Sequence, residues 1–188
     1  MRSPICVTVV IGAVMFTGAV CQAVEPAKAS PGGACSLLTP QDLAKVVEGP
    51  ASQPRSINIP YTKGTEHDHD GMMHTCGFSV GTHQVTVSFT THEVTEEGRK
   101  AYETKTARWE QQIRERGARV DVKQDGGTRC VLIVATKGEK GAGEQQTSCT
   151  STKGEYLVTV AVATPGAEAG VPISAVKALV DQAASRLP

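Results

Sequence analysis

Alternation between apolar and polar side chains along two short segments constrains the fold of this chain more than any other feature. In HQVTVSFTTH, residues 83–92, Val85, Val87 and Phe89 alternate with threonine and serine. The same period of two recurs in EYLVTVAVA, residues 155–163. Successive side chains of a strand point to opposite faces, so both segments are predicted to be strands with one face in a core.

Short glycine-containing turns separate the strand patterns. Gly81-Thr82 follows CGFSV, DGG (residues 125–127) lies between ARVDVKQ and RCVLIVAT, and KGE (residues 153–155) lies between QQTSCTST and the last strand pattern. Turns of this length join antiparallel strands. We therefore expect several hairpins, with a flexible loop at residues 137–146 between the last two pairs.

A first, short helix is predicted within LLTPQDLAKVVEG, residues 37–49. Thr39 is a favourable N-cap, Pro40 suits the first helical position, and the Asp42 carboxylate complements the positive end of the helix dipole. Gly49 is a typical stop. Residues 50–75 contain three prolines and are expected to be irregular and polar.

Two further helices are predicted. In residues 95–117, Tyr102, Trp109 and Ile113 form an apolar stripe that we expect in the core, and Glu110 and Arg114 have the spacing of an ion pair. Residues 173–188 form a closing amphipathic helix. The resulting order α-β-β-α-β-β-β-β-α predicts an α+β fold with a largely antiparallel sheet flanked by helices, in one domain spanning residues 35–188.

The first residues indicate export. A positively charged start is followed by an uncharged run, residues 5–20, and by the small-residue stretch CQA. This is the layout of a signal peptide, residues 1–23, followed by a flexible linker, residues 24–34. An uncleaved anchor is the alternative, but the run is shorter than the roughly 18 residues of a spanning helix. A lipid on Cys21 is another, although Val20 before it matches the lipidation pattern poorly. The mature chain has no predicted transmembrane span, and we expect it to be periplasmic or secreted.

Four of the six cysteines follow the signal peptide: Cys35, Cys76, Cys130 and Cys149. An even number in an exported chain favours two disulfides, and four cysteines allow three pairings. Cys130 and Cys149 lie in strand patterns on either side of the 137–146 loop, and neighbouring antiparallel strands bring Cα atoms to about 5.5 Å. We favour this pair together with Cys35–Cys76, which would join the irregular N-terminal third to the sheet.

The segment CSLLTPQDLAKVVEG, the second cysteine in CGFSVG and the ending SRLP together resemble a family of exported bacterial proteins. Many of its members are actinobacterial envelope lipoproteins that carry a domain of unknown function. The resemblance covers residues 35–188 and implies an architecture similar to PsbP-like domains, with an antiparallel sheet between helices. It also supports the pair Cys35–Cys76. It implies no catalytic residues, and the poor lipidation pattern departs from the lipoproteins.

The segment TEHDHDGMMHTC, residues 65–76, is rich in potential metal ligands. Neutral imidazoles suit Zn²⁺, Cu²⁺ and Ni²⁺, carboxylates can complete the shell, and thioethers favour Cu⁺. The candidate ligands are His67, Asp68, His69, Asp70, Met72, Met73 and His74. The spacing matches no standard structural zinc pattern, so the alternative is a solvated loop that turns at Asp70-Gly71. His83 and His92 are expected to be ordinary surface residues.

Other function classes lack a sequence signature. The chain contains no G-x-S-x-G, no H-E-x-x-H and no P-loop, so we predict that it is not an enzyme. It carries 19 basic and 19 acidic residues without a basic block, and aromatic residues make up only 4%, which argues against nucleic acid as a partner. We expect a non-catalytic envelope domain that binds a protein, a lipid or a small ligand. The alternative is binding or buffering of a transition metal by residues 67–74.

Overall fold

The computed structural model describes residues 33–60, 72–90, 96–135, 144–166 and 170–188. Within them, a seven-stranded sheet has the order β1-β2-β3-β7-β6-β5-β4, and every neighbouring pair is antiparallel. The strands are β1 (Arg55–Pro60), β2 (Met72–Val80), β3 (His83–Thr90), β4 (Arg119–Asp125), β5 (Thr128–Val134), β6 (Glu144–Lys153) and β7 (Tyr156–Pro165). The helical elements are η1 (Ala34–Ser36), α1 (Pro40–Ala44), α2 (Glu96–Glu115) and α3 (Ile173–Ser185). The predicted α+β class is therefore confirmed.

The sheet consists of two meanders that meet at its centre. Strands β1, β2 and β3 form one, and β4, β5, β6 and β7 form the other. The two join where β3 pairs with β7, for example Val85 opposite Val162. The three predicted hairpin turns are present, each with a glycine of positive φ at its first position: Gly81, Gly126 and Gly154.

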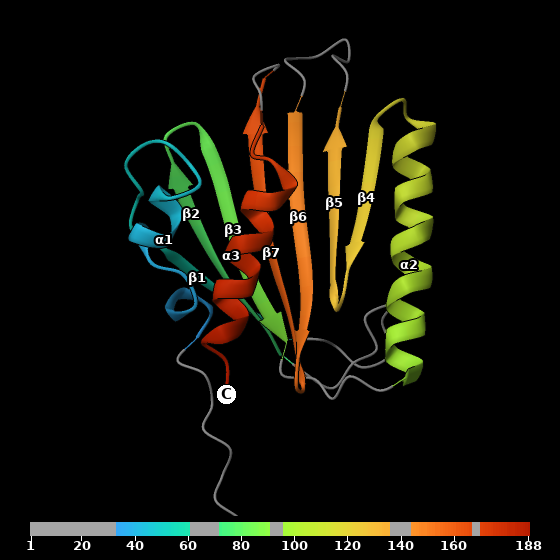
Figure 1. Ribbon diagram of the computed structural model, residues 1–188, viewed down its shortest axis with the longest axis horizontal. Coiled ribbons are helices and arrows are strands. Elements are labelled where there is room, and N and C mark those ends of the chain that lie inside the picture. Colours follow the sequence, from blue (N-terminus) through green and yellow to red (C-terminus); the bar gives the residue numbers. More distant parts are fainter. Residues whose placement is uncertain (1–32, 61–71, 91–95, 136–143, 167–169) are drawn as a thin grey trace, which may run out of the picture.

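One face of the sheet, which we call the helix face, is covered by η1, α1 and α3 (Figure 1). Helix α3 lies over β5, β6 and β7, and η1 lies against β1, β2 and β3. The aliphatic and aromatic side chains of the two alternating segments point to this face, among them Val85, Val87, Phe89, Val158 and Val160. Burial of apolar surface at about 25 cal/mol per Å² makes this layer the main source of stability.

Helix α3 has the predicted apolar stripe. Its buried residues are Val176, Leu179, Val180, Ala183 and Ala184. These positions recur every three or four residues and so share one side of a helix. The stripe faces the helix face of the sheet, as the amphipathic pattern predicts.

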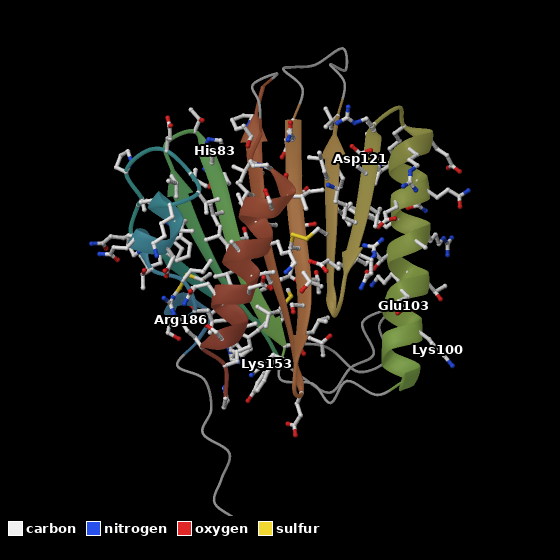
Figure 2. All side chains as sticks on the ribbon, in the orientation of Figure 1. His83, Lys100, Glu103, Asp121, Lys153 and Arg186 are labelled. Atoms are coloured by element: carbon white, nitrogen blue, oxygen red, sulfur yellow. A yellow bond between two sulfur atoms is a disulfide. The ribbon has the colours of Figure 1, made fainter. Side chains whose placement is uncertain are left out.

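Helix α1 begins as predicted but ends earlier. The Thr39 side chain accepts a hydrogen bond from the Asp42 backbone, and the Asp42 carboxylate accepts from the Thr39 backbone in return, which completes a capping box. Arg186, just after α3, donates to the same carboxylate at 2.7 Å and to the Leu37 carbonyl at 2.7 Å (Figure 2). Burial alone would raise the pKa of Asp42, but the bonds from Arg186 and Thr39 outweigh it and lower that pKa to about 2. The chain end is thereby tied to the first helix.

Both predicted disulfides are present. Cys35 is joined to Cys76 with a Cα–Cα distance of 5.0 Å, and Cys130 to Cys149 with 4.1 Å. The first links η1 to β2, and the second links β5 to β6 at directly opposite positions. Each such bridge stabilises a fold by about 2–4 kcal/mol.

Helix α2 lies at the β4 end of the sheet (Figure 1) and packs against the opposite face. Ile113 packs with Val120, Val131 and Ile133, a small cluster separate from the main core. The predicted aromatic stripe is wrong at Trp109, which is 41% exposed. Glu110 is buried instead and pairs with Arg129 of β5. The sheet presents a cation here, so a carboxylate and not an indole occupies the inner side of the helix. Tyr102 lies outside the side chains that the structure describes.

Strand β1 corrects the expectation of an irregular segment at residues 50–75. Residues Arg55–Pro60 pair with β2 in full register, from Arg55 opposite Gly77 to Pro60 opposite Met72. Proline lacks the N–H of an interior strand, but an edge strand such as β1 tolerates it at its solvent side. In the described part of the chain, no helix is long and apolar enough to cross a membrane.

Candidate functional site

The predicted metal ligands are only partly within the described residues. His67, Asp68, His69 and Asp70 lie outside them, as does the Met72 side chain. Met73 and His74 lie on β2 and leave the strand on opposite faces. The His74 ring is half-buried on the helix face and stacks on Phe89 at a centroid distance of 4.8 Å. The metal site therefore stays a prediction.

No group of three or more metal-ligating side chains comes together within the described ranges. His83 lies at the start of β3, with its Nδ1 2.9 Å from Oγ1 of Thr164 on β7. Thr164 is 1% exposed, so this contact ties two central strands together inside the helix face. His92 lies outside the described residues.

The face opposite α3 has a different chemistry, and we call its central part the hydroxyl row. It consists of one residue from each of four adjacent strands: Thr75 on β2, Ser88 on β3, Thr159 on β7 and Thr150 on β6. The register places Thr75 opposite Ser88, Ser88 opposite Thr159, and Thr159 opposite Thr150. Neighbouring strands lie about 4.8 Å apart, so the four hydroxyls span about 14 Å across the sheet.

All four residues of the hydroxyl row are half-buried. The Thr150 and Thr159 hydroxyl oxygens are 2.9 Å apart, a hydrogen bond across β6 and β7. Oγ1 of Thr75 is buried and has no hydrogen-bond partner among the described residues. A buried hydroxyl without a partner costs free energy, so Oγ1 of Thr75 is an unsatisfied group at the β2 end of the row.

At its β5 end, the hydroxyl row is followed by the charged residue Arg129. Arg129 lies opposite Thr150, and its guanidinium pairs with the Glu110 carboxylate of α2. This pair neutralises its own charges, so the row presents hydroxyls without a net charge. Trp109 precedes Glu110 by one position, about 100° around the helix, and is 41% exposed. An exposed indole therefore lies on the same helix as the group that ends the row.

Small side chains lie beside the row. In the next cross-strand row Thr86 is opposite Ala161, and Ala161 is opposite Ser148. Such residues leave room above the sheet while offering further hydroxyls. Sequence reasoning did not identify these residues, because alternation was used only to find the apolar face. The signal was present: the residues between the valines are serine, threonine and alanine.

Comparison with solved structures identifies a similar fold. The chain is similar to the extracellular domain of PknH from Mycobacterium tuberculosis, which is known from a crystal structure. The TM-score is 0.51 and the sequence identity is 12%. The similarity covers 84% of this chain and 97% of the other. No protein-family model matches the chain, and no curated protein matches it. At this identity the comparison establishes a shared fold.

Proposed function

We propose that this protein is an exported, non-catalytic recognition domain that binds a neutral, polyhydroxylated ligand along the hydroxyl row. The observation that carries the proposal is the row of four half-buried hydroxyls across β2, β3, β7 and β6. At one end of the row, Oγ1 of Thr75 has no hydrogen-bond partner in the part of the chain that the structure describes. Hydroxyls both donate and accept, so they suit a ligand that does the same. A neutral ligand also avoids the cost of placing an unpaired charge against an uncharged surface.

Three further features support the proposal. Two disulfides and the signal-peptide layout are typical of an exported protein. The protein of similar fold is named as an extracellular domain. Trp109, exposed on α2 one position before Glu110, offers an aromatic surface of the kind that packs against the apolar faces of sugars. No catalytic arrangement is required, because binding alone is the activity.

The test uses two neutral oligosaccharide probes, chitotetraose and maltotetraose, with a charged oligogalacturonate as comparison. Binding is followed by changes in backbone amide resonances of the ¹⁵N-labelled protein. We expect a neutral probe to shift the resonances of Thr75, Ser88, Thr150 and Thr159 and to leave α3 unchanged. Shifts confined to the helix face, or no shifts with either neutral probe, would contradict the proposal.

Two matched variants separate an effect on ligand binding at the hydroxyl row from an effect on stability. Thr159→Val removes the hydroxyl that bonds Thr150. We expect this variant to raise the dissociation constant of the neutral probe about tenfold. Thr128→Val is the control, because Thr128 makes an equivalent hydroxyl bond to Ser151, at 3.2 Å, on the helix face. Equal losses in both variants would assign the effect to stability and not to recognition.

Transition-metal binding is the second candidate function, and the observation that favours it is the density of ligands in residues 67–74. Of these, His74 has a half-buried ring on β2, where Phe89 holds it in place. A fixed imidazole next to a ligand-rich segment gives a chelate one preorganised donor. Calorimetric titration of the metal-stripped protein with Zn²⁺, Cu²⁺ and Ni²⁺ tests it, beside a variant with His67, His69 and His74 changed to alanine. One-site binding tighter than micromolar that is lost in the variant supports the site, and equal weak binding in both proteins rejects it.

A further inference from the structure

The strands that carry the hydroxyl row have few charged side chains on the same face. Cys130 and Cys149 lie in the core of the helix face, so alternation places Arg129 and the even-numbered residues of β6 on the face opposite α3. Among the described residues of β2, β3, β5, β6 and β7, the charged side chains on that face are Arg129 and Glu144. Glu144 is separated from Thr150 by about 20 Å along β6. Arg129 is therefore the charged strand residue nearest to the row.

Arg129 extends the row by one strand and keeps part of its guanidinium accessible. It lies opposite Thr150 in the register of β5 and β6, and its side chain is 24% exposed. Its Nη2 donates to the Glu110 carboxylate. Nε and Nη1 have no hydrogen-bond partner within the described ranges, and neither is a buried atom. A guanidinium donates from all three nitrogens, so Arg129 retains donors for a ligand.

Glu110 of α2 controls the charge of this end of the row. Its side chain is only 6% exposed, so water screens its field on the Arg129 guanidinium poorly. A ligand anion near Arg129 therefore meets a carboxylate together with the guanidinium. Such an anion would lose its hydration and gain little attraction in return.

The contact between α2 and β5 does not require a charge at position 110. A glutamine amide oxygen would also accept a hydrogen bond from Arg129. A buried carboxylate is costly to desolvate, and a buried ion pair adds little net stability over an uncharged alternative. The charge of Glu110 therefore points to a role beyond packing.

We infer that Glu110 is a specificity-determining residue of the hydroxyl row, and that its negative charge makes the row select neutral over carboxylated oligosaccharides. This selectivity presupposes the proposed binding of a polyhydroxylated ligand at the row. When residue 110 is neutral, Arg129 presents an uncompensated positive charge at the end of the row. Its two remaining nitrogens then suit a carboxylate, which a guanidinium binds through parallel hydrogen bonds. A buried residue that the ligand need not touch thus determines which sugars bind.

The ligand that gains from this change must carry two kinds of group. Its hydroxyls bond the row, as in the native protein, and its carboxylate binds Arg129. An oligogalacturonate has both, whereas acetate has only the carboxylate. Acetate should therefore bind much more weakly than the oligosaccharide.

The test compares the native protein with Glu110→Gln by titration of the ¹⁵N-labelled proteins with maltotetraose, tetragalacturonate and acetate. We expect the dissociation constant of tetragalacturonate to fall about tenfold or more in the variant, with shifted resonances at Arg129, Thr150 and Thr159. The constant of maltotetraose should change by less than about threefold. The gain for tetragalacturonate should shrink at high ionic strength, because Arg129 is partly exposed.

Two further variants serve as controls. Glu103→Gln makes the same charge change at an exposed position of α2 (Figure 2) and should leave all three constants unchanged. Glu110→Gln combined with Arg129→Gln removes both charges, and it should abolish the gain for tetragalacturonate while maltotetraose still binds. A gain of affinity is not an effect that a loss of stability produces, so a purely structural role of Glu110 predicts no gain.

The outcomes separate this inference from the proposed function. No gain for tetragalacturonate in Glu110→Gln would overturn the inference, as would an equal gain in Glu103→Gln. A gain that persists without Arg129, or one that acetate shows equally, would overturn it too. A native protein that binds neither neutral probe, together with a Glu110→Gln variant that binds tetragalacturonate, would contradict the proposed function and leave the control of charge by Glu110 in place.

Discussion

The two faces of the same seven strands carry different chemistry. On β3 and β7, residues Val87 and Val160 lie on the helix face and are completely buried, whereas their neighbours Ser88 and Thr159 lie on the other face and are half-buried. Adjacent residues of one strand thus belong to a core and to a hydrogen-bonding surface. The alternation of side chains makes this separation possible, since each strand contributes every second side chain to the core and the others to the opposite face.

Among the described residues, a buried carboxylate paired with an arginine fixes a helical element on each face. Asp42 and Arg186 join α1 to the chain end on the helix face, and Glu110 and Arg129 join α2 to β5 on the other. The first pair lies beside a large apolar core, and the second lies beside a cluster of only a few residues. We conclude that stability is concentrated on one face, and that the other is left available for contacts.

The largest difference between the two faces is expected for two neighbouring substitutions on β3. Phe89→Ala removes a ring that contacts His74 and Tyr156 in the core, and we expect it to lower the free energy of unfolding by about 3–5 kcal/mol. Ser88→Ala, one residue away on the other face, should cost less than about 1 kcal/mol. Urea denaturation measures both, and similar values would show that the two faces contribute equally.

An intermediate effect is expected at the ion pair of the helix face. The folded pKa of Asp42 is about 2, below the ordinary 3.8, so the carboxylate stabilises the fold above pH 4 and this stabilisation is lost as the pH falls toward 2. Asp42→Asn should lower stability by about 2 kcal/mol at neutral pH and by much less near pH 2. Denaturation curves across this pH range measure the difference, and a constant difference would rule out the carboxylate as its source.

The smallest effect is expected at the ion pair of the other face. Glu110→Gln should cost about 1 kcal/mol, because the glutamine amide oxygen can still accept a hydrogen bond from the Arg129 guanidinium. Hydrogen exchange should become faster in α2 and β4 and stay unchanged in α3. Glu103→Gln, at an exposed position of the same helix (Figure 2), is the control. Faster exchange throughout the sheet would mean that the two faces are not independent.

Much of the fold followed from local patterns in the sequence. Strands β3 and β7, the glycine turns and α3 were predicted, because alternation and turn chemistry are encoded within a few neighbouring residues. Both disulfides were predicted from the even cysteine count together with the strand map, and the family resemblance supported Cys35–Cys76. Strand β1 was missed since Pro50, Pro54 and Pro60, before it and at its end, are typical of loops, and only the pairing with β2 makes it a strand. The exposure of Trp109 was also missed, because it depends on Arg129, a residue 20 positions away whose charge selects Glu110 for the inner side of α2.

The candidate site was less predictable than the fold. The hydroxyl row combines residues from four strands that are adjacent only in the sheet order β2-β3-β7-β6, and no local pattern specifies that order. The same holds for the Thr75 hydroxyl, whose burial without a hydrogen-bond partner among the described residues arises only in the folded sheet. The candidate metal ligands all lie within residues 67–74 and were therefore easy to propose, and they stay a prediction.

The strand order also determines when the protein can fold during synthesis. Strand β3 is complete at residue 90, but its second neighbour β7 ends at residue 165, so most of the chain must emerge before the central pair can form. Until then, the β3 edge and its valines have no partner. Pairing between strands this far apart in the sequence is slow, and an unpaired apolar strand edge is prone to aggregation until its partner is present. A chain of this topology therefore leaves the β3 edge of its first meander unpaired until β7, the last strand, has emerged.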